Sequence, residues 1–422
     1  MIKERLLSLD VFRGFTILLM TIVNNPGDWG HVYAPLLHAE WHGCTPTDFV
    51  FPFFIFILGV AIPFAMPDKT FDGNTFIKIT VRSLRIFCLG FFLFFFKKIE
   101  LFGLEGISLL LLRLGITILV AYSLLGNFST KVKMYLVFTI FTVLILLAYN
   151  TEMFGNVRIP GVLQRIGIVY FFISILYLKT KPSTQIIVAI LLLLGYWALM
   201  AFVQVPGIGE PNFEKGTNFA AWVDSISLPN HMYVETKTWD PEGILSTLPA
   251  IATGIIGVLI GCLLNLNITK IEITKKMIIY GILMTISGFA WSFIFPINKA
   301  LWTSSYVLYT AGLATLCLSF LYYIIEIANL KKWTTLFLIW GVNPMIVFFF
   351  SGIIPRILSM IEVQNPENKT EEINLQNYLY KFWIAPNFEN PMNASLAGAL
   401  IYVTIWSFIL WIFYRNRLIF KV

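Results

Sequence analysis

The sequence predicts an all-α, polytopic membrane protein with about twelve transmembrane helices. Of its 422 residues, 58% are hydrophobic and only 13% are charged, and the mean hydropathy is +0.78. A soluble globular domain is about 45 to 50% apolar and about 25% charged. A bilayer-spanning helix needs about 20 residues, so twelve of them fit in this chain together with loops of moderate size. We therefore expect a single transmembrane domain over residues 1–422.

The elements of this domain follow from apolar runs of spanning length. Short polar turns separate most of them, and three connections are long, at 26–48, 205–243 and 356–394. We expect helices, in chain order, at 9–25, 49–66, 83–96, 107–126, 133–149, 160–178, 185–204, 244–265, 277–295, 301–325, 333–355 and 395–414.

The distribution of basic residues predicts the orientation. Parity places the three long connections on one face with 9 of the 30 basic residues, whereas 18 lie on the opposite face, Lys3, Arg5 and Lys421 among them. Because cytoplasmic loops are enriched in Lys and Arg, we expect both termini to be cytoplasmic. The net charge of +7 then reflects orientation, and we expect no nucleic-acid partner. The expected location is a bacterial inner membrane, as an integral multi-pass protein.

The first long connection is the densest polar segment and holds three of the four histidines, His31, His38 and His42. Imidazole is a common zinc ligand, but these three could share a face only on a helix, and glycines and a proline interrupt the segment, so we expect no metal. A histidine close to Asp48 is a better candidate for general acid–base catalysis, although histidines that merely line an interface give the same pattern. Cys44 is a nucleophile by chemistry alone.

Ionisable residues within a span are costly, about 2.5 to 3.5 kcal/mol each on insertion scales. Asp10 and Arg13 lie three residues apart on one helix face, as either a local ion pair or an anion site at the inner mouth. Arg158 and Arg165 lie seven apart, which again returns them to one face. Arg165 lies about 10 Å deeper than Arg158 and needs a partner there. Asp48 and a ligand oxygen are both candidates.

One internal repeat is visible. Residues 109–125 align with a second segment 52 positions further along the chain. The matched positions include Arg113 with Arg165 and Gly115 with Gly167. A basic turn and another apolar run follow each copy, which indicates that a helix pair was duplicated in tandem.

Three later segments bring polar residues into apolar helices. We expect Asp240 to cap a membrane helix, with Glu242 in its first turn, where acidic residues favour the helix dipole. Asn298 and Lys299 form an outer turn ahead of a hydroxyl-rich helix. Asn343, followed by a proline, interrupts an apolar run, and such a break is tolerated only where neighbours or a cavity satisfy the freed backbone.

Six sequence blocks follow one another through nearly the whole chain. They are LDVFRG (9–14), HAEWHGCTPTDFVFP (38–52), RIPGVLQRIG (158–167), DPEGILSTLPAIATG (240–254), NKALWTSSYVLYTAG (298–312) and WGVNP (340–344). Together they resemble the heparan-alpha-glucosaminide N-acetyltransferase family. The resemblance implies a transmembrane acyltransferase that takes an acetyl group from cytoplasmic acetyl-CoA and passes it to the amino group of a glucosamine-type sugar on the outer side.

The resemblance also assigns roles to residues. The family's catalytic histidine begins the block HAEWHG, so its role falls on His38, and the role of the aspartate ten residues on falls on Asp48. His42 and Cys44 stand where animal members have other residues. The chain departs from those members by an additional helix pair at about 100–150 and by the expected absence of their luminal domain.

The expected mechanism uses His38 as a general base oriented by Asp48, or as a covalent carrier of the acetyl group. Acetyl-CoA is the co-substrate, and Arg13, Arg82 and Arg85 are candidate partners of its phosphates at the cytoplasmic face. The candidate binding residues are Asn24, Asn25, Trp41, Arg158, Gln164, Arg165, Asp240, Asn298, Lys299, Trp302, Ser304 and Asn343, with Asp10 and Arg13 at the inner mouth.

Two other classes of protein stay open. A proton-coupled sugar transporter would also have about twelve spans, but it usually carries ionisable groups near the midplane, whereas most of those in this chain lie near helix ends. A non-catalytic membrane scaffold would not need His38 and Asp48 together. The expected partners are acetyl-CoA, an amino-sugar or glycan acceptor and the lipid bilayer, with a homodimer left open.

Overall fold

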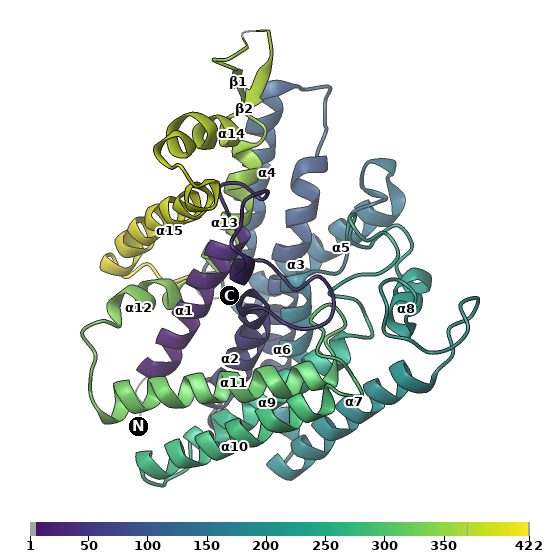
Figure 1. The fold of residues 1–422 in the computed structure, drawn as a ribbon, viewed down its shortest axis with the longest axis vertical. Helices are drawn as coiled ribbons and strands as arrows, with labels where there is room; N and C mark the ends of the chain where they lie inside the picture. The colour runs from purple at the N-terminus through teal and green to yellow at the C-terminus, as the bar shows by residue number, and fades with distance from the viewer. Residues whose placement is uncertain (1–5, 369, 421–422) are drawn as a thin grey trace.

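The computed structural model describes residues 6–368 and 370–420, and nearly all of its regular structure is helical (Figure 1). Among these residues, eleven helices are long and apolar enough to cross a bilayer, and there are twelve spans if a pair of helices bent by 79° at a short break counts as one. This confirms the prediction of an all-α polytopic membrane protein with about twelve spans. Lys3, Arg5 and Lys421, counted above on the cytoplasmic face, lie outside the described residues.

Each spanning helix overlaps one of the predicted apolar runs. Some begin earlier than the run, as at Asp72, whose side chain accepts a hydrogen bond from the Thr75 N–H and caps a polar first turn that hydropathy does not detect. The spanning helices are α1 (Leu7–Asn24), α2 (Val50–Ala65), α3 (Gly73–Phe95), α4 (Gly106–Leu125), α5 (Thr130–Asn150), α6 (Val162–Lys179), α7 (Pro182–Phe202), α9 (Thr247–Leu264), α10 (Lys270–Trp291), α11 (Ser304–Tyr322), the bent pair α12 (Thr335–Val342) and α13 (Pro344–Leu358), and α15 (Pro391–Arg415).

Shorter elements occupy the connections and helix ends. The two strands pair antiparallel, with Val363 opposite Ile373. These elements are η1 (Ala34–Leu36), η2 (Pro46–Phe49), η3 (Phe96–Lys98), η4 (Glu152–Phe154), α8 (Phe219–Ser227), η5 (Tyr323–Ile327), β1 (Glu362–Gln364), β2 (Glu372–Asn374), α14 (Leu375–Leu379), η6 (Tyr380–Ile384) and η7 (Ala385–Asn387).

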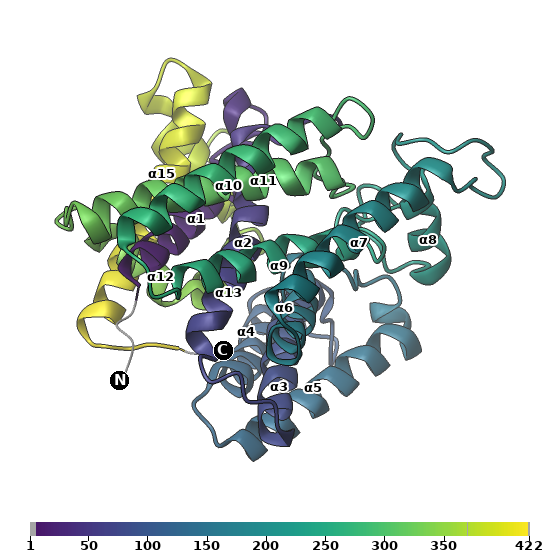
Figure 2. The same ribbon diagram turned by 90° about the horizontal axis from the view of Figure 1, so that it is seen from below.

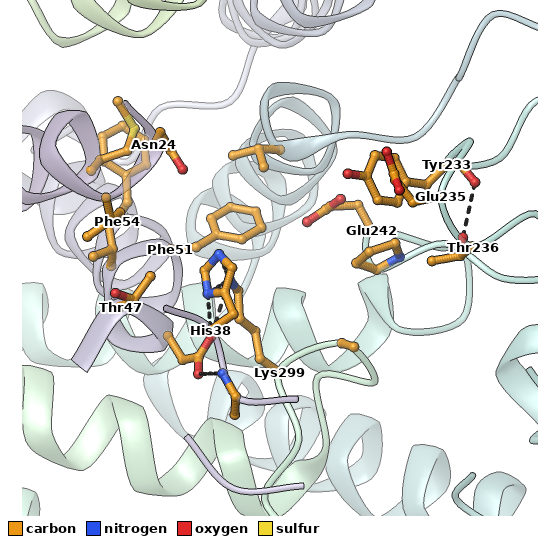
Figure 3. A pocket seen from close by; sticks show the side chains of 18 of the residues that line it. Asn24, His38, Thr47, Phe51, Phe54, Tyr233, Glu235, Thr236, Glu242 and Lys299 are labelled. Carbon is orange, nitrogen blue, oxygen red and sulfur yellow. Dashed lines mark hydrogen bonds and ion pairs between the residues drawn. The ribbon is translucent and has the colours of Figure 1, made fainter. Parts of the chain in front are cut away.

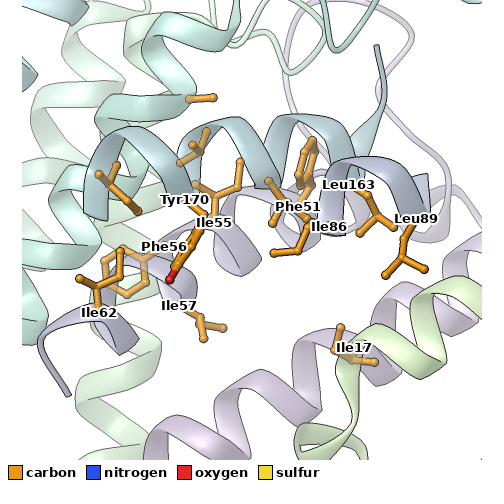
Figure 4. Packing of buried hydrophobic residues seen from close by; sticks show 14 of the residues in the cluster. Ile17, Phe51, Ile55, Phe56, Ile57, Ile62, Ile86, Leu89, Leu163 and Tyr170 are labelled. Atoms are coloured by element: carbon orange, nitrogen blue, oxygen red, sulfur yellow. The ribbon is translucent and has the colours of Figure 1, made fainter. Parts of the chain in front are cut away.

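Helices α1, α2, α6, α9 and α11 pack against one another at the centre of the bundle (Figure 2). Their buried apolar side chains fill the space between them, with Ile55 and Phe56 of α2 completely buried (Figure 4). Helices α2 and α9 come into backbone contact, because a Cβ on Gly59 would lie 2.1 Å from the carbonyl oxygen of Gly254. Close packing at small residues is a usual source of helix association in a bilayer.

The additional helix pair of α4 and α5 packs on α3, at one side of the bundle. The two copies of the internal repeat therefore have different surroundings. A Cβ on Gly167 of α6 would lie 2.7 Å from the Ser83 carbonyl oxygen, whereas one on Gly115 of α4 would meet nothing within 4 Å. Only the second copy of the repeat uses its glycine for close helix packing.

The three long connections meet at one end of the bundle. The indole N–H of Trp41, in the first connection, donates a 2.8 Å hydrogen bond to the carbonyl oxygen of Phe213 in the second. The hydroxyl of Tyr33 donates a 2.5 Å bond to Asn393 Oδ1, where the third connection enters α15. This placement agrees with the parity of the twelve predicted spans.

The predicted break at Asn343 separates α12 from α13. Its side-chain amide donates to the Leu418 carbonyl oxygen at 2.9 Å, and its Oδ1 accepts from the Phe420 N–H at 2.9 Å. Asn343 therefore ties the C-terminal segment to the break and lies outside the cavity described below, so the structure does not support it as a ligand-binding residue.

Candidate active site

A cavity of about 720 Å³ lies at the end of the bundle where the long connections meet (Figure 3). One part is formed by Thr16 and Ile17, from the middle of α1, and by Phe51 and Phe54, from the first two turns of α2, so the cavity continues from the loops to about the middle of α1. Its size is typical of small-molecule sites. The loop end is lined by His38, Glu40, Trp41, Asp48, Lys215, Tyr233, Glu235, Thr236, Trp239, Glu242 and Lys299.

His38 and Asp48 form a hydrogen-bonded pair, with Nδ1 of the imidazole 2.7 Å from Oδ1 of the carboxylate. The Asp48 side chain is only 1% exposed, whereas the His38 side chain is 52% exposed. The backbone N–H groups of Ala39 and Thr45 donate to Asp48 Oδ2 at 3.0 and 2.9 Å. Both carboxylate oxygens thus act as acceptors, which favours the tautomer with a proton on Nδ1 and a lone pair on Nε2 of His38. A general base needs such a lone pair.

Lys299 lies beside this pair. Its Nζ is 3.0 Å from His38 Nδ1, 3.1 Å from His38 Nε2 and 3.5 Å from Asp48 Oδ1. Burial lowers the pKa of Lys299, and the carboxylates of Asp48 and Glu242 oppose this effect without cancelling it. A lysine with a lowered pKa exchanges protons more readily near neutral pH than an exposed lysine does.

The loop that carries Lys299 is held on both sides. The Gly43 N–H donates to the Ile297 carbonyl oxygen at 2.7 Å, and the Asn298 Oδ1 accepts from the Leu301 N–H at 2.9 Å. Trp302 adopts a φ of 51°, in the left-handed region that a bulky side chain rarely occupies. Dense packing around the buried Trp302 ring maintains this conformation, so the loop that carries Lys299 is held in one strained conformation, as is common at functional sites.

An acidic cluster faces His38 and Lys299 across the cavity (Figure 3). Arg158 donates to both oxygens of Asp240 at 2.8 and 2.6 Å and also pairs with Glu242, so the three side chains carry a net charge of about −1. Burial lowers the pKa of Arg158, but Glu242 and Asp240 outweigh it and hold that pKa above its usual value. Burial likewise raises the pKa of Glu242, and Arg158 and Arg165 reverse the effect and lower it.

The expectation that Asp240 caps a membrane helix is wrong. Helix α9 begins at Thr247, with Ser246 at its N-cap, and residues 240–246 form turns instead. The carboxylate of Asp224 accepts the N–H groups of Asp240 and Ile244 at 3.2 and 2.9 Å and holds these turns. Asp240 is free to bind Arg158 because the backbone around it is held by another side chain.

The other candidates of the first connection have separate partners. His31 Nδ1 lies 2.7 Å from Asp28, and His42 Nδ1 lies 3.5 Å from the Asn298 amide, so the three histidines do not converge. Burial raises the pKa of the Cys44 thiol to about 11, which leaves it protonated and a poor nucleophile near neutral pH.

Arg165 does not pair with Asp48, which was one of its two candidate partners. Its Nη2 donates to Ser246 Oγ at 2.5 Å and to the Gly243 carbonyl oxygen at 3.2 Å, because α6 faces the start of α9 rather than the first connection. Its Nε and Nη1 are buried and have no hydrogen-bond partner among the described residues. Arg165 lies behind the acidic cluster and not in the cavity wall.

Several other predicted residues support the site without lining the cavity. Trp302 lies beneath Arg165, with the guanidinium carbon 5.1 Å from its ring, and donates to Thr253 Oγ1 at 3.1 Å. The Ser304 hydroxyl donates to the Leu193 carbonyl oxygen at 2.7 Å. These contacts hold helices together, so the structure does not support Trp302 or Ser304 as ligand-binding residues.

The arginines near the predicted cytoplasmic end have protein partners. Arg13 forms a 2.9 Å ion pair with Asp10 at the end of α1 opposite the cavity. The Arg82 guanidinium lies 4.6 Å from the Tyr170 ring centroid, and Arg85 Nε donates to the Leu124 carbonyl oxygen. An anion site at the inner mouth stays a prediction.

The remaining predicted residues do line cavities. Asn24 and Trp41 line the large cavity together with the residues described above. Asn25 and Gln164 line a smaller cavity of about 440 Å³ that adjoins it.

The second connection supplies lining residues that the sequence prediction missed. Tyr233, Glu235, Trp239 and Glu242 belong to it, and Trp239 meets Trp41 edge-on with ring centroids 5.1 Å apart. The only signal in the sequence is the concentration of acidic and aromatic residues in this long connection, which does not indicate what they face.

The fold defines a polytopic membrane protein, and a hydrogen-bonded His38–Asp48 pair lies in a cavity at one end of its helical bundle. No protein-family model matches the chain. The chain is similar to heparan-alpha-glucosaminide N-acetyltransferase from Mus musculus, with 26% identity over 99% of this chain and 61% of the relative, and from Homo sapiens, with 27% identity over 100% of this chain and 60% of the relative. The resemblance to this family is confirmed, and the chain spans about three fifths of the length of these curated relatives.

Proposed function

We propose that this protein is a transmembrane acetyltransferase that moves an acetyl group from acetyl-CoA to the amino group of a glucosamine-type sugar. The observation that carries the proposal is the His38–Asp48 pair at the loop end of a cavity that continues to the middle of α1 and along the first two turns of α2. The 26% and 27% identity to proteins named as N-acetyltransferases supports the same reaction. Residues 1–422 would form one catalytic domain, with α4 and α5 as an addition to the family core.

The cavity offers different surroundings to the two substrates. Its inner part, with Ile17, Phe51 and Phe54, suits the acyl arm of acetyl-CoA, which arrives from the cytoplasmic side while the nucleotide stays outside the bilayer. Its loop end, with Glu235 and Glu242, attracts the protonated amine of the acceptor. The excess of 18 basic residues over 9 supports a location of the loop end on the outer side.

His38 is proposed to remove the proton that blocks the reaction. The protonated amine of the acceptor first gives one proton to His38 Nε2, which releases it to solvent. The neutral amine then attacks the thioester carbonyl, a C–N bond forms and the C–S bond breaks, while a second amine proton passes through His38 Nε2 to the sulfur that leaves. Asp48 keeps the imidazole in the required tautomer and stabilises the imidazolium that forms. An acetyl-imidazole intermediate on Nε2 uses the same geometry, with the CoA thiol leaving before the acceptor attacks.

The test is an assay of the purified full-length protein in proteoliposomes, with labelled acetyl-CoA and glucosamine on opposite sides. We expect N-acetylglucosamine to form with the acetyl group on the glucosamine side. Uptake of labelled glucosamine is measured in the same vesicles without acetyl-CoA. Uptake of unmodified sugar with no acetylated product would instead identify the protein as a transporter.

A further inference from the structure

The small cavity differs from the large one in charge. The large cavity is lined by four carboxylates and three cationic side chains, whereas the small one is lined by two arginines, Arg158 and Arg356, and no carboxylate. At about 440 Å³ the small cavity has room for a small ligand or a part of one. The residues common to both walls are Met20, Asn24, Arg158, Val162 and Phe348, so the two cavities are continuous neighbours.

Arg356 carries the uncompensated charge of the small cavity. It lies in the last turn of α13, and its Nη1 donates to the Gly352 carbonyl oxygen at 2.6 Å. No carboxylate among the described residues forms an ion pair with it, whereas Arg158 is neutralised by Asp240 and Glu242. The rest of Arg356 is left to bind what enters the cavity.

A second basic residue ends the neighbouring span. Lys97 lies in η3, shortly after the α3 residues Leu93 and Phe94, which line the small cavity together with Arg356. The guanidinium group of Arg113 donates hydrogen bonds to the carbonyl oxygens of Ile99 and Lys97. Cations that repel one another at the end of membrane helices are costly, and a bound anion removes that cost. The amides of Asn25 and Gln164 add neutral polar groups to the same wall.

We infer that the small cavity binds a phosphate ester through Arg356, and that this group belongs to the acceptor sugar or to a lipid headgroup. A guanidinium fork matches two phosphate oxygens, and Lys97 adds the second positive charge that a phosphate monoester can use. Helix ends at this level lie where lipid headgroups lie. The contact with the large cavity places a sugar phosphate within reach of His38. Binding of this group does not depend on acetyl transfer.

The test is equilibrium binding of N-acetylglucosamine 1-phosphate and of N-acetylglucosamine to the purified full-length protein. Neither sugar has a free amine, so failure of the proposed reaction would not affect the result. We expect the phosphate sugar to bind at least about tenfold more tightly, since a hydrogen bond to a charged group contributes at least that much. Arg356→Gln should abolish the preference, Arg356→Lys should keep part of it, and Arg417→Gln, at the opposite end of the bundle, should keep all of it.

A second experiment, with lipids, distinguishes a phosphate on the acceptor sugar from a phosphate in a lipid headgroup. If phosphatidylglycerol nanodiscs raise the Tm of the wild type above its value in phosphatidylcholine, and Arg356→Gln loses that increment while the sugar phosphate shows no preference, the group is a lipid headgroup. Equal behaviour of wild type and Arg356→Gln towards both ligands overturns the inference. Should Arg356→Gln not fold, Asn25→Asp brings a carboxylate into the same wall and should weaken the phosphate ligand by a similar factor, and an unchanged affinity would contradict the inference.

Discussion

At the scale of single residues, the candidate site separates an exposed base from a buried acid. Asp48 is 1% exposed and His38 is 52% exposed, which agrees with the proposed roles of the carboxylate in orienting the imidazole and of the imidazole in contacting ligands. Lys299 Nζ, 3.0 and 3.1 Å from the two ring nitrogens of His38, lies next to the position that the proposed mechanism gives to the acceptor amine. Substrate binding therefore has to move Lys299 away from Nε2, and its lowered pKa makes this cation easier to displace or deprotonate.

His38→Ala tests the base directly. Removal of the imidazole should lower kcat by about 10² to 10⁴, the usual contribution of general acid–base catalysis, and leave acetyl-CoA affinity largely intact. His31→Ala is the matched control, because His31 pairs with Asp28 and does not line the large cavity. Steady-state kinetics on the two purified variants give the comparison. Equal losses would point to a folding effect.

Asp48→Asn should have an intermediate effect. An asparagine amide would donate to His38 Nδ1 and favour the tautomer that carries its proton on Nε2, where the base should be unprotonated. The base is still present, so some turnover should remain. The kcat of this variant is expected to fall between those of the wild type and His38→Ala, and a kcat equal to wild type would show that Asp48 has no part in orientation.

Asp224 should make stability depend on pH. Burial raises its pKa to about 6 from an ordinary 3.8, although the N–H groups of Ile244 and Asp240 lower it in part. A carboxyl group with a raised pKa takes up a proton on folding. The contribution of Asp224 to the free energy of unfolding is therefore complete below pH 3.8, and it is lost as pH rises through about 6.

The Tm of Asp224→Asn, minus that of the wild type, should therefore increase between about pH 4 and about pH 7. Thermal unfolding in detergent at several pH values measures it. Glu210→Gln, an exposed change in the same connection, is the control, and its Tm difference should stay constant. A pH-independent difference for Asp224→Asn would contradict the assignment.

At the scale of elements, the sequence predicted the features that depend on hydropathy, namely the spans. It did not predict the features that depend on packing between helices. The spans and the break at Asn343 follow from apolar runs, since an unsatisfied backbone is not tolerated in a bilayer. The 79° bend between α12 and α13 does not follow, because it depends on the C-terminal segment that Asn343 binds. The contact of Arg165 with Ser246 and Gly243 could not be predicted, because residue spacing indicates a helix face and not the neighbour of that face.

The two copies of the repeat give a matched pair of arginines. Arg165 binds Ser246 and lies behind Glu242, whereas Arg113 caps the carbonyl oxygens of Lys97 and Ile99. Arg165→Leu should shift the turns that carry Glu242 and lower turnover by up to about 100-fold, since small displacements in a site have effects of this size. Arg113→Leu should affect stability more than turnover.

The test measures turnover, the acceptor KM and Tm of the two variants side by side. These values distinguish a positioning role from a structural role for each arginine. A positioning role predicts a raised acceptor KM in Arg165→Leu with an unchanged KM for acetyl-CoA. Arg165→Lys should also fail, because an ammonium cannot replace the fork. Wild-type turnover in Arg165→Leu, or a greater loss in Arg113→Leu, would show that the roles are assigned the wrong way round.

At the scale of the whole molecule, the site depends on connections that are far apart in the chain. The first connection supplies His38 and the turn before α11 supplies Lys299, both recognisable in the sequence as polar segments at helix ends. The second connection adds Glu235 and Glu242, and no periodicity or spacing predicts that it folds over the first. The acid–base pair could therefore be predicted, and the wall that faces it could not.

The orientation of the protein determines on which side of the membrane the proposed reaction delivers the acetyl group. With 18 basic residues on the face of the short turns and 9 on the other, the loops around His38 should lie outside. Glu210→Cys, at an exposed position of the second connection, and Lys181→Cys, in an exposed short turn, report the two faces once all four native cysteines are replaced. A membrane-impermeant maleimide added to intact cells should label position 210, and position 181 should react only after permeabilisation. The reverse pattern would place His38 in the cytoplasm and remove any need for acetyl groups to cross the membrane, so the cavity would then have to serve an acceptor that comes from the same side as acetyl-CoA.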